Sequence, residues 1–370
     1  MHRMSFGVQH VFAVVLQVIS YLIVAFSDSI TTSLIGVVFA SLGSGIGEVC
    51  YLALASHYSK HIISSWSSGT GGAGIFGALA YAALTEPHLL DLTPQTTLLT
   101  MLVVPAVCFV TYFALLTPAA TIYPVMKLTQ PRTWFVFKVE QKHEQLVSTI
   151  SQKGSFASTD SSSNESTQDG NYRELRETIT SADVAIVVED RKPKSFKDRC
   201  LLMLPTMKYM IPLSLTYFAQ YLISQGLSEF TIFDCDHGFG LDIRSQYRWY
   251  QVISQFGIFL TRSSVSFFQL PAFLLILLPV FEFINASAFV YDAFSHYIPH
   301  LWVSFAMMFL QGLIAGASYV NTLFRIHKSV HPDVREFSLG ITAAWNAAGI
   351  AGAGVASIPL HSFFCGRYAS

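Results

Sequence analysis

Long apolar runs that lack charge are the feature that most restricts the fold of this chain. Residues 8–26 carry no charge, and residues 30–56 carry a single acid, Glu48. A helix of roughly 20 residues, at about 1.5 Å per residue, crosses the hydrocarbon core of a bilayer. Only 12% of the 370 residues are charged, whereas a soluble domain has about 25%. The chain is therefore predicted to be an all-α polytopic membrane protein that lies in the lipid bilayer.

The apolar runs predict nine transmembrane spans, four before a polar central region and five after it. The sixth span is short, and its first residues include Tyr247, Arg248, Trp249 and Tyr250, a base among aromatics that is typical of a membrane interface. We expect an N-terminal bundle at residues 1–117, a central loop at 118–205 and a C-terminal bundle at 206–370. The spans are residues 8–26, 30–56, 66–84, 97–117, 206–233, 245–260, 267–288, 301–324 and 337–360.

The charged residues are unevenly placed, because about half of them lie in the central region. In the short connections between spans, Lys60 falls on the same expected side as this region. Asp28, Glu86 and Asp91 share the other side with no base. Since Lys and Arg are enriched in cytosolic connections, the central loop is predicted to be cytosolic.

One stretch of the central loop, residues 154–180, is rich in small polar residues and is predicted to be disordered. Within it, Tyr172 and Leu175 fit the short tyrosine-plus-apolar pattern that clathrin adaptors read as a sorting signal. Such a short pattern also arises by chance. A trafficking address and unstructured filler therefore both remain open for this segment.

A glycine-rich segment opens the third predicted span directly after Trp66. Gly69, Gly71 and Gly74 match the spacing of a dinucleotide-binding loop, but no clear strand precedes them. Small residues instead suit a membrane helix that a neighbour approaches closely, or one that opens to line a cavity. If the helix is broken, its hydroxyls and amides could receive an anionic or hydroxylated headgroup; otherwise they satisfy each other in close packing. The candidate residues are Ser67, Ser68, Gly69, Thr70, Gly71 and Gly72.

The same segment, W-S-S-G-T-G-G-A-G, resembles the battenin family of lysosomal membrane proteins. Further similar segments occur in the family's order along almost the whole chain. They are G-V-V-F-A-S-L-G-S-G-I-G-E at 36–48, Q-Y-R-W-Y-Q at 246–251, R-S-S at 262–264, Y-V-N-T at 319–322, R-E-F at 335–337 and P-L-H at 359–361.

This resemblance implies a divergent major facilitator-like architecture, in which two helical bundles move around a central site. Family members have eleven helices, and residues 8–26 match the third of them. The first two helices are therefore expected to be missing here, through an incomplete gene model or a short isoform. The family also carries a glutamate where this chain has Gln220, so an acid that could serve proton coupling is lost there.

Isolated polar residues inside the predicted spans are candidates for a substrate or proton pathway. Glu48 and Glu282 are acids in apolar runs, where each either serves protons or cations or stays neutral and bonded to a neighbouring helix. Arg262 and Arg248 could bind a phosphate or carboxylate, or could anchor a helix end at the interface. Asn321, near the end of its span, has the same two interpretations as the hydroxyls of the glycine-rich segment: binding a polar group, or satisfying a neighbour in close packing.

These features favour a transporter of a small polar solute that works by alternating access. The resemblance implies clearance of glycerophosphodiesters, transport of arginine, or lysosomal pH control, in the lysosomal or late endosomal membrane. The alternative is a non-transporting scaffold that organises trafficking. No nucleophile elbow, Walker lysine, metal-ligand set or basic surplus is present, so no enzyme, cofactor, metal or nucleic-acid partner is predicted.

Overall fold

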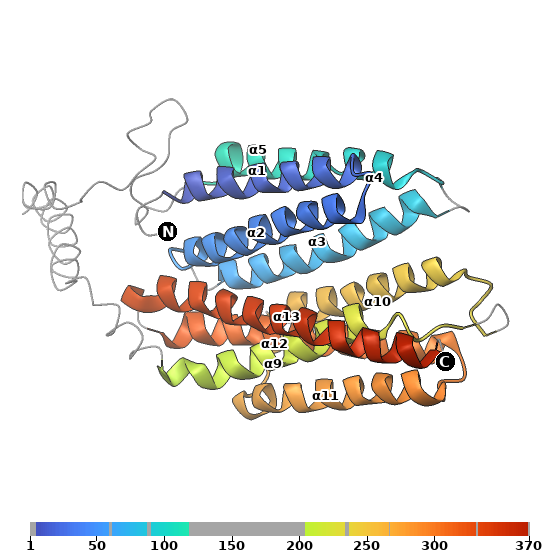
Figure 1. The fold of residues 1–370 in the computed structure, drawn as a ribbon. Helices are drawn as coiled ribbons and strands as arrows, with labels where there is room; N and C mark the ends of the chain where they lie inside the picture. The colour runs from blue at the N-terminus through green and yellow to red at the C-terminus, as the bar shows by residue number, and fades with distance from the viewer. Residues whose placement is uncertain are drawn as a thin grey trace, which may run out of the picture. The chain divides into compact units, whose positions relative to one another are not determined.

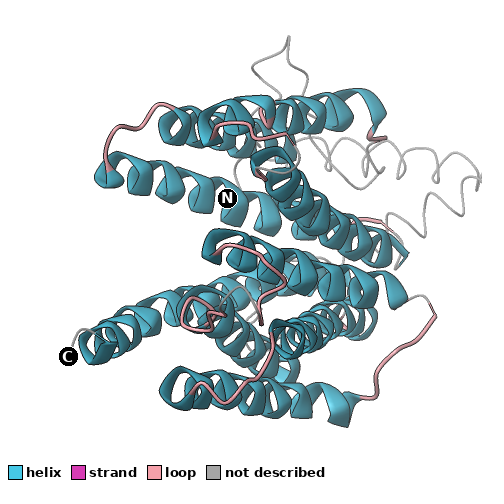
Figure 2. Cartoon of the chain, turned by 90° about the vertical axis from the view of Figure 1, so that its right-hand side faces the viewer, coloured by secondary structure: helices cyan, strands magenta, loops and turns pink. Residues whose placement is uncertain are grey.

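The computed structural model describes residues 5–58, 61–86, 90–117, 204–233, 237–265, 267–330 and 332–368. Within these ranges the backbone forms helices and loops and no strand (Figure 2). All of these helices belong to one compact unit, which comprises Phe6–Ile122 and Met203–Ser370. The predicted sorting residues Tyr172 and Leu175 lie outside the described residues.

Two of the N-terminal helices begin at hydroxyl side chains. Ser29 accepts a hydrogen bond from the amide of Thr32 at 3.1 Å, and Thr93 accepts one from the amide of Thr96 at 3.3 Å. Each hydroxyl satisfies an amide that has no partner inside its own helix. The elements are α1 (Phe6–Ala25), α2 (Ile30–Ala55), α3 (His61–Thr85), α4 (Pro94–Thr100), α5 (Val103–Val110) and the π-helix η1 (Thr111–Leu115).

The C-terminal elements follow the central loop. Asp242 starts one helix by accepting a hydrogen bond from the amide of Ser245 at 3.1 Å, where a negative charge is favoured by the helix dipole. The elements are the 3₁₀-helix η3 (Leu204–Thr206), α9 (Met207–Leu222), the π-helix η4 (Ile223–Leu227), α10 (Ile243–Ser264), α11 (Ala272–Ser295), α12 (Leu301–Ser329) and α13 (Pro332–Tyr368).

Six described segments are long and apolar enough to cross a membrane, which confirms the all-α polytopic class. They are Phe6–Ala25, Ile30–Ala55, Pro94–Leu115, Ala272–Ser295, Leu301–Ser329 and Val334–Gly366. The other three predicted spans are also helices, α3, α9 and α10, and they run alongside the rest (Figure 1). They do not meet the same requirements of length and hydropathy, because α9 has only 16 residues and α3 and α10 carry many polar residues.

Several helices extend beyond the predicted spans. The third span was expected to begin at Trp66, but α3 begins at His61, because the polar residues before Trp66 continue the helix. The sixth was expected to be a short span at 245–260, but α10 extends from its cap at Asp242 through Arg262 to Ser264. Arg262 therefore lies on the last turn of α10, from which it reaches the candidate site described below.

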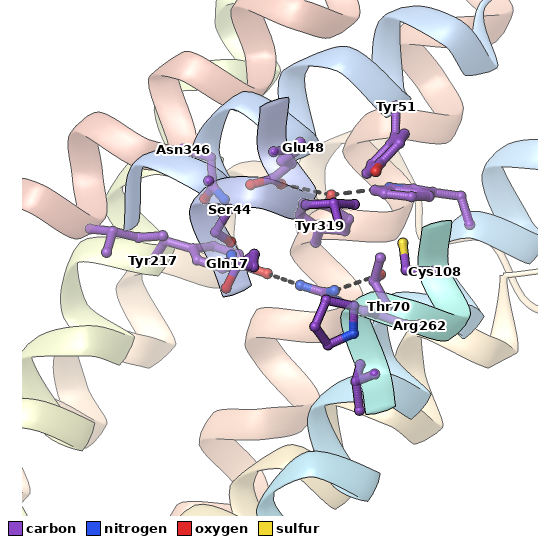
Figure 3. Close-up of a pocket in the computed structure, with 18 of the residues that line it drawn as sticks. Gln17, Ser44, Glu48, Tyr51, Thr70, Cys108, Tyr217, Arg262, Tyr319 and Asn346 are labelled. Atoms are coloured by element: carbon purple, nitrogen blue, oxygen red, sulfur yellow. Dashed lines mark hydrogen bonds between the residues drawn. The ribbon is translucent and has the colours of Figure 1, made fainter. Parts of the chain in front are cut away.

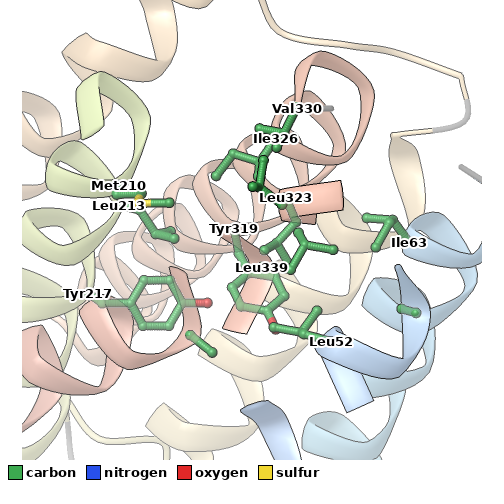
Figure 4. Packing of buried hydrophobic residues seen from close by; sticks show 13 residues of the cluster. Leu52, Ile63, Met210, Leu213, Tyr217, Tyr319, Leu323, Ile326, Val330 and Leu339 are labelled. Atoms are coloured by element: carbon green, nitrogen blue, oxygen red, sulfur yellow. The ribbon is translucent and has the colours of Figure 1, made fainter. Parts of the chain in front are cut away.

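The helices before and after the central loop meet along two seams, where α2 packs against α13 and α3 packs against α10. An apolar cluster fills the end at which α2 ends and α3 and α9 begin (Figure 4). Leu52, Ile63, Met210 and Leu323 in this cluster are fully buried. The division into bundles at residues 117 and 206 stays a prediction.

Glycines allow α10 to approach α12 very closely. A Cβ atom on Gly257 would lie 2.6 Å from the carbonyl oxygen of Phe309, and one on Gly316 would lie 2.7 Å from the carbonyl oxygen of Ile258. Small residues at such positions let two backbones come into contact. The contact holds the last turn of α10 against α12, next to Tyr319.

Candidate functional site

A cavity of about 380 Å³ lies between helices from both halves of the described chain (Figure 3). We call it the central cavity. Its wall combines apolar residues with polar side chains from α1, α2, α3, α9, α10, α12 and α13. The polar and aromatic wall residues used below are Gln17, Glu48, Tyr51, Trp66, Thr70, Tyr217, Arg262, Tyr319 and Asn346.

Glu48 is placed in the cavity by close packing of α1 against α2. A Cβ on Gly43, one turn before Glu48, would lie 3.1 Å from the carbonyl oxygen of Ala13, so little space separates the two helices. The Oε1 atom of Glu48 accepts a hydrogen bond of 2.9 Å from the hydroxyl of Tyr319 on α12. Glu48 is thus hydrogen-bonded to another helix and also lines the cavity, and both interpretations of this acid stay predictions.

Arg262 points into the same cavity from the last turn of α10. Its guanidinium donates to the Thr70 hydroxyl at 2.9 Å and to the Tyr217 hydroxyl at 2.6 Å. The guanidinium carbon also lies 4.0 Å from the centre of the Tyr319 ring, a cation–π contact. Arg262 is therefore turned towards other helices in the described structure, rather than outwards as a simple interfacial anchor would be.

Three aromatic residues of this site were not among the predicted site residues. Tyr217 and Tyr319 both contact Arg262, and the indole nitrogen of Trp66 donates to the Tyr319 hydroxyl at 3.4 Å. Trp66 and Tyr319 do lie in segments on which the family resemblance rests, W-S-S-G and Y-V-N-T. No local signal in the sequence marks Tyr217, whose position is evident only from the packing of α9.

The glycine-rich segment forms an unbroken helix. This agrees with the prediction that its small residues pack closely against a neighbouring helix, and not with a helix that is broken to receive a headgroup. The hydroxyl of Ser68 bonds to that of Ser263 on α10 at 2.9 Å, and a Cβ on Gly71 would lie 3.1 Å from the Cα of Phe259. Thr70 is the one residue of the six that lines the central cavity. The described side chain of Ser67 is buried, and Gly72 packs against the Phe259 ring.

Two other candidates lie away from the central cavity. Glu282 is fully buried in α11, and neither of its carboxyl oxygens has a hydrogen-bond partner among the described residues. Asn321 accepts a hydrogen bond of 2.9 Å from the amide of Leu270 and donates to the carbonyl of Ala317. Asn321 thus holds the segment before α11 in place.

Arg248 lies at the other end of α10 and forms an ion pair with Glu86 at 2.8 Å. The same guanidinium nitrogen donates to Ser245, whose hydroxyl also donates to the Glu86 carboxylate. These contacts join the residue after α3 to the first turns of α10. Arg248 also lines a second cavity of about 520 Å³, together with Glu229 and Tyr247.

This ion pair is expected to stabilise the fold, because its two side chains are only 18% and 11% exposed. Replacing Glu86 with alanine leaves a largely buried guanidinium without its carboxylate and should lower the free energy of unfolding by about 3 kcal/mol. Thermal unfolding of the purified protein in detergent measures the change. Asp28→Ala, which removes an exposed acid, is the control, and Glu86→Ala/Arg248→Leu should recover part of the loss. Equal melting temperatures for Glu86→Ala and Asp28→Ala would contradict this prediction.

Metal-ligating side chains do not gather in the described part of the chain. No group of three or more His, Cys, Asp or Glu residues there could hold a metal ion. His57 lies 3.7 Å from Glu336. The polar groups that line the central cavity include one base, one acid, hydroxyls, the amides of Gln17 and Asn346, and the Cys108 thiol.

Comparison with known proteins identifies the family. The family described as CLN3 protein matches residues 1–367. Battenin from Canis lupus familiaris is 33% identical over 346 residues, which cover 94% of this chain and 68% of that protein. Protein btn1 from Aspergillus fumigatus is 32% identical over 375 residues, which cover 98% of this chain and 76% of that protein. The chain therefore belongs to the CLN3 family, and it is a multi-pass membrane protein of this lysosomal and vacuolar family.

Proposed function

We propose that this chain transports a small polar solute across the lysosomal membrane by alternating access. The observation that carries the proposal is the central cavity, in which Glu48 and Thr70 from the N-terminal half meet Arg262 and Tyr319 from the C-terminal half. Ionisable groups buried within a membrane are costly and mark solute or ion pathways. A site shared by two halves opens to either side when one half moves relative to the other.

Contacts between the two halves of the chain lie at both ends of the central cavity. The apolar cluster around Leu52, Ile63 and Leu323 packs between the two halves at one end of the cavity. At the other end, Glu86 on one half and Arg248 on the other form an ion pair. Opening to either side then requires separation of one of these two contacts.

A glycerophosphodiester is the solute class that we favour. Arg262 presents a guanidinium to the cavity beside the hydroxyls of Thr70 and Tyr217, and such a group binds phosphate oxygens with more than one hydrogen bond. Glu48, which accepts a hydrogen bond from Tyr319, is the group that we assign to proton binding or to contact with a solute hydroxyl. Transport of a basic amino acid such as arginine would reverse these roles, with Glu48 as the contact for the solute.

The test measures glycerophosphodiesters and arginine retained in lysosomes of battenin-deficient cells that express this chain. The variants are Glu48→Gln and a chain lacking residues 154–180, compared at matched protein level and matched arrival in lysosomes. A transporter loses clearance with Glu48→Gln and keeps it without the loop segment. The reverse pattern would favour the scaffold, in which clathrin adaptors bind the loop through Tyr172 and Leu175 and lysosomal pH changes only indirectly.

A further inference from the structure

An acid and a base share the central cavity without forming an ion pair. Glu48 and Arg262 both line it, yet no ion pair within 4.0 Å joins these two described residues. Opposite charges attract strongly where little water surrounds them, and a guanidinium readily takes both oxygens of a carboxylate. Something in the cavity wall must therefore keep the two groups apart.

Tyr319 contacts both charged groups at once. Its hydroxyl donates to Glu48 at 2.9 Å, while the Arg262 guanidinium carbon lies 4.0 Å from the centre of its ring (Figure 3). The ring is 2% exposed, and its hydroxyl also accepts a hydrogen bond from Trp66 at 3.4 Å. These contacts hold the ring in one orientation, with the carboxylate at its hydroxyl end and the guanidinium over its face.

Two further helices, α3 and α9, also hold the Arg262 guanidinium. Its two terminal nitrogens donate to Thr70 and Tyr217, which are neutral hydroxyls on α3 and α9. The groups in direct contact with the Arg262 guanidinium are therefore neutral hydroxyls and an aromatic face, while Glu48 acts on its charge only from a distance. A direct contact with the Glu48 carboxylate would instead neutralise it and occupy its donors.

We propose that Tyr319 is a positioning residue that keeps Glu48 from pairing with Arg262, so that the guanidinium stays available to an anionic group of the solute. This role rests on the proposed function, since it prepares the same cavity for binding. It also predicts how fast the Arg262 side chain reacts with a chemical reagent, which can be measured without knowing the solute.

The experiment measures how fast phenylglyoxal, a reagent for unpaired arginine side chains, modifies Arg262 in the purified full chain in detergent. Arg248, which is ion-paired with Glu86, is the internal reference for a paired arginine and is read by mass spectrometry in the same sample. With Tyr319→Leu, we expect the rate at Arg262, expressed relative to the rate at Arg248, to fall about tenfold, the effect of roughly one charge-assisted hydrogen bond.

A second substitution separates this role from a merely structural one. In Tyr319→Leu/Glu48→Gln no carboxylate remains to pair with Arg262, so its reactivity should return to the wild-type level. Tyr319→Phe keeps the ring that Arg262 lies over but removes the hydroxyl that holds Glu48, so the rate at Arg262 should fall as it does in Tyr319→Leu. Tyr319→Met, whose flexible side chain fills irregular space, replaces Tyr319→Leu if the leucine variant unfolds.

Two results would overturn the proposal. One is an unchanged reaction rate at Arg262 in a folded Tyr319→Leu or Tyr319→Met protein; the other is a rate that stays low after Glu48→Gln is added. Transport is judged separately, by lysosomal clearance. If the modification pattern is as expected while no solute is cleared, the proposed function fails and the role of Tyr319 stands.

Discussion

Replacing Arg262 with alanine should reduce lysosomal clearance of glycerophosphodiesters by about ten- to a hundredfold. A hydrogen bond to a charged group contributes about 1.5–3 kcal/mol, and each 1.4 kcal/mol corresponds to roughly a tenfold change in binding. Arg262→Lys keeps the charge, but a single ammonium does not reproduce the planar donors that reach Thr70 and Tyr217. We therefore expect the lysine variant to retain only part of the clearance.

The control for Arg262→Ala is Lys208→Ala, which removes an exposed base near the start of α9, outside the central cavity. Retained glycerophosphodiesters are measured by mass spectrometry in lysosomes with matched amounts of each protein. Lys208→Ala should clear them like the wild type. Normal clearance by Arg262→Ala would show that the central cavity is not the solute site.

Replacing Gly257 with alanine should prevent α10 from packing against α12. The added Cβ would lie 2.6 Å from the Phe309 carbonyl oxygen and 3.0 Å from the Leu313 amide nitrogen, and neither is a flexible side chain. Since the backbones must move apart, we expect the free energy of unfolding to fall by about 1–3 kcal/mol. Arg262 on the same helix would then lose its position over the Tyr319 ring.

The matched control is Gly354→Ala in α13, where the added Cβ meets no described atom within 4 Å. This change should be neutral or slightly stabilising, because alanine favours a helix more than glycine does. Thermal unfolding and the yield of monodisperse protein in detergent measure both variants. A Gly257→Ala protein as stable as Gly354→Ala would contradict the close contact.

The helical membrane class could be predicted because it depends on local properties. The uncharged runs at 8–26 and 30–56 are visible in any short window, and both are found as helices, α1 and α2. Segments with mixed composition were harder to delimit. The sixth span was placed too short because the polar residues of α10 look like a helix end in isolation, whereas α3 and the loop at Phe233 satisfy them.

The site was predictable only in part. Glu48, Thr70 and Arg262 were found as polar residues in or beside apolar runs, and the structure brings these three together. Glu282 had the same local signature but lies outside the central cavity. A lone acid in an apolar run shows that something must compensate for its burial, but it does not show which cavity it faces.

The helical membrane class and the family resemblance follow from the amino-acid sequence, because hydropathy and ordered motifs are properties of consecutive residues. That an acid, a base and an aromatic ring form one site follows from the packing of the helices. Glu48 and Tyr319 are 271 positions apart, and Thr70 and Arg262 are 192 apart. Contacts over such separations depend on which helices pack together and in which register, and close approaches at glycines such as Gly257 set that register.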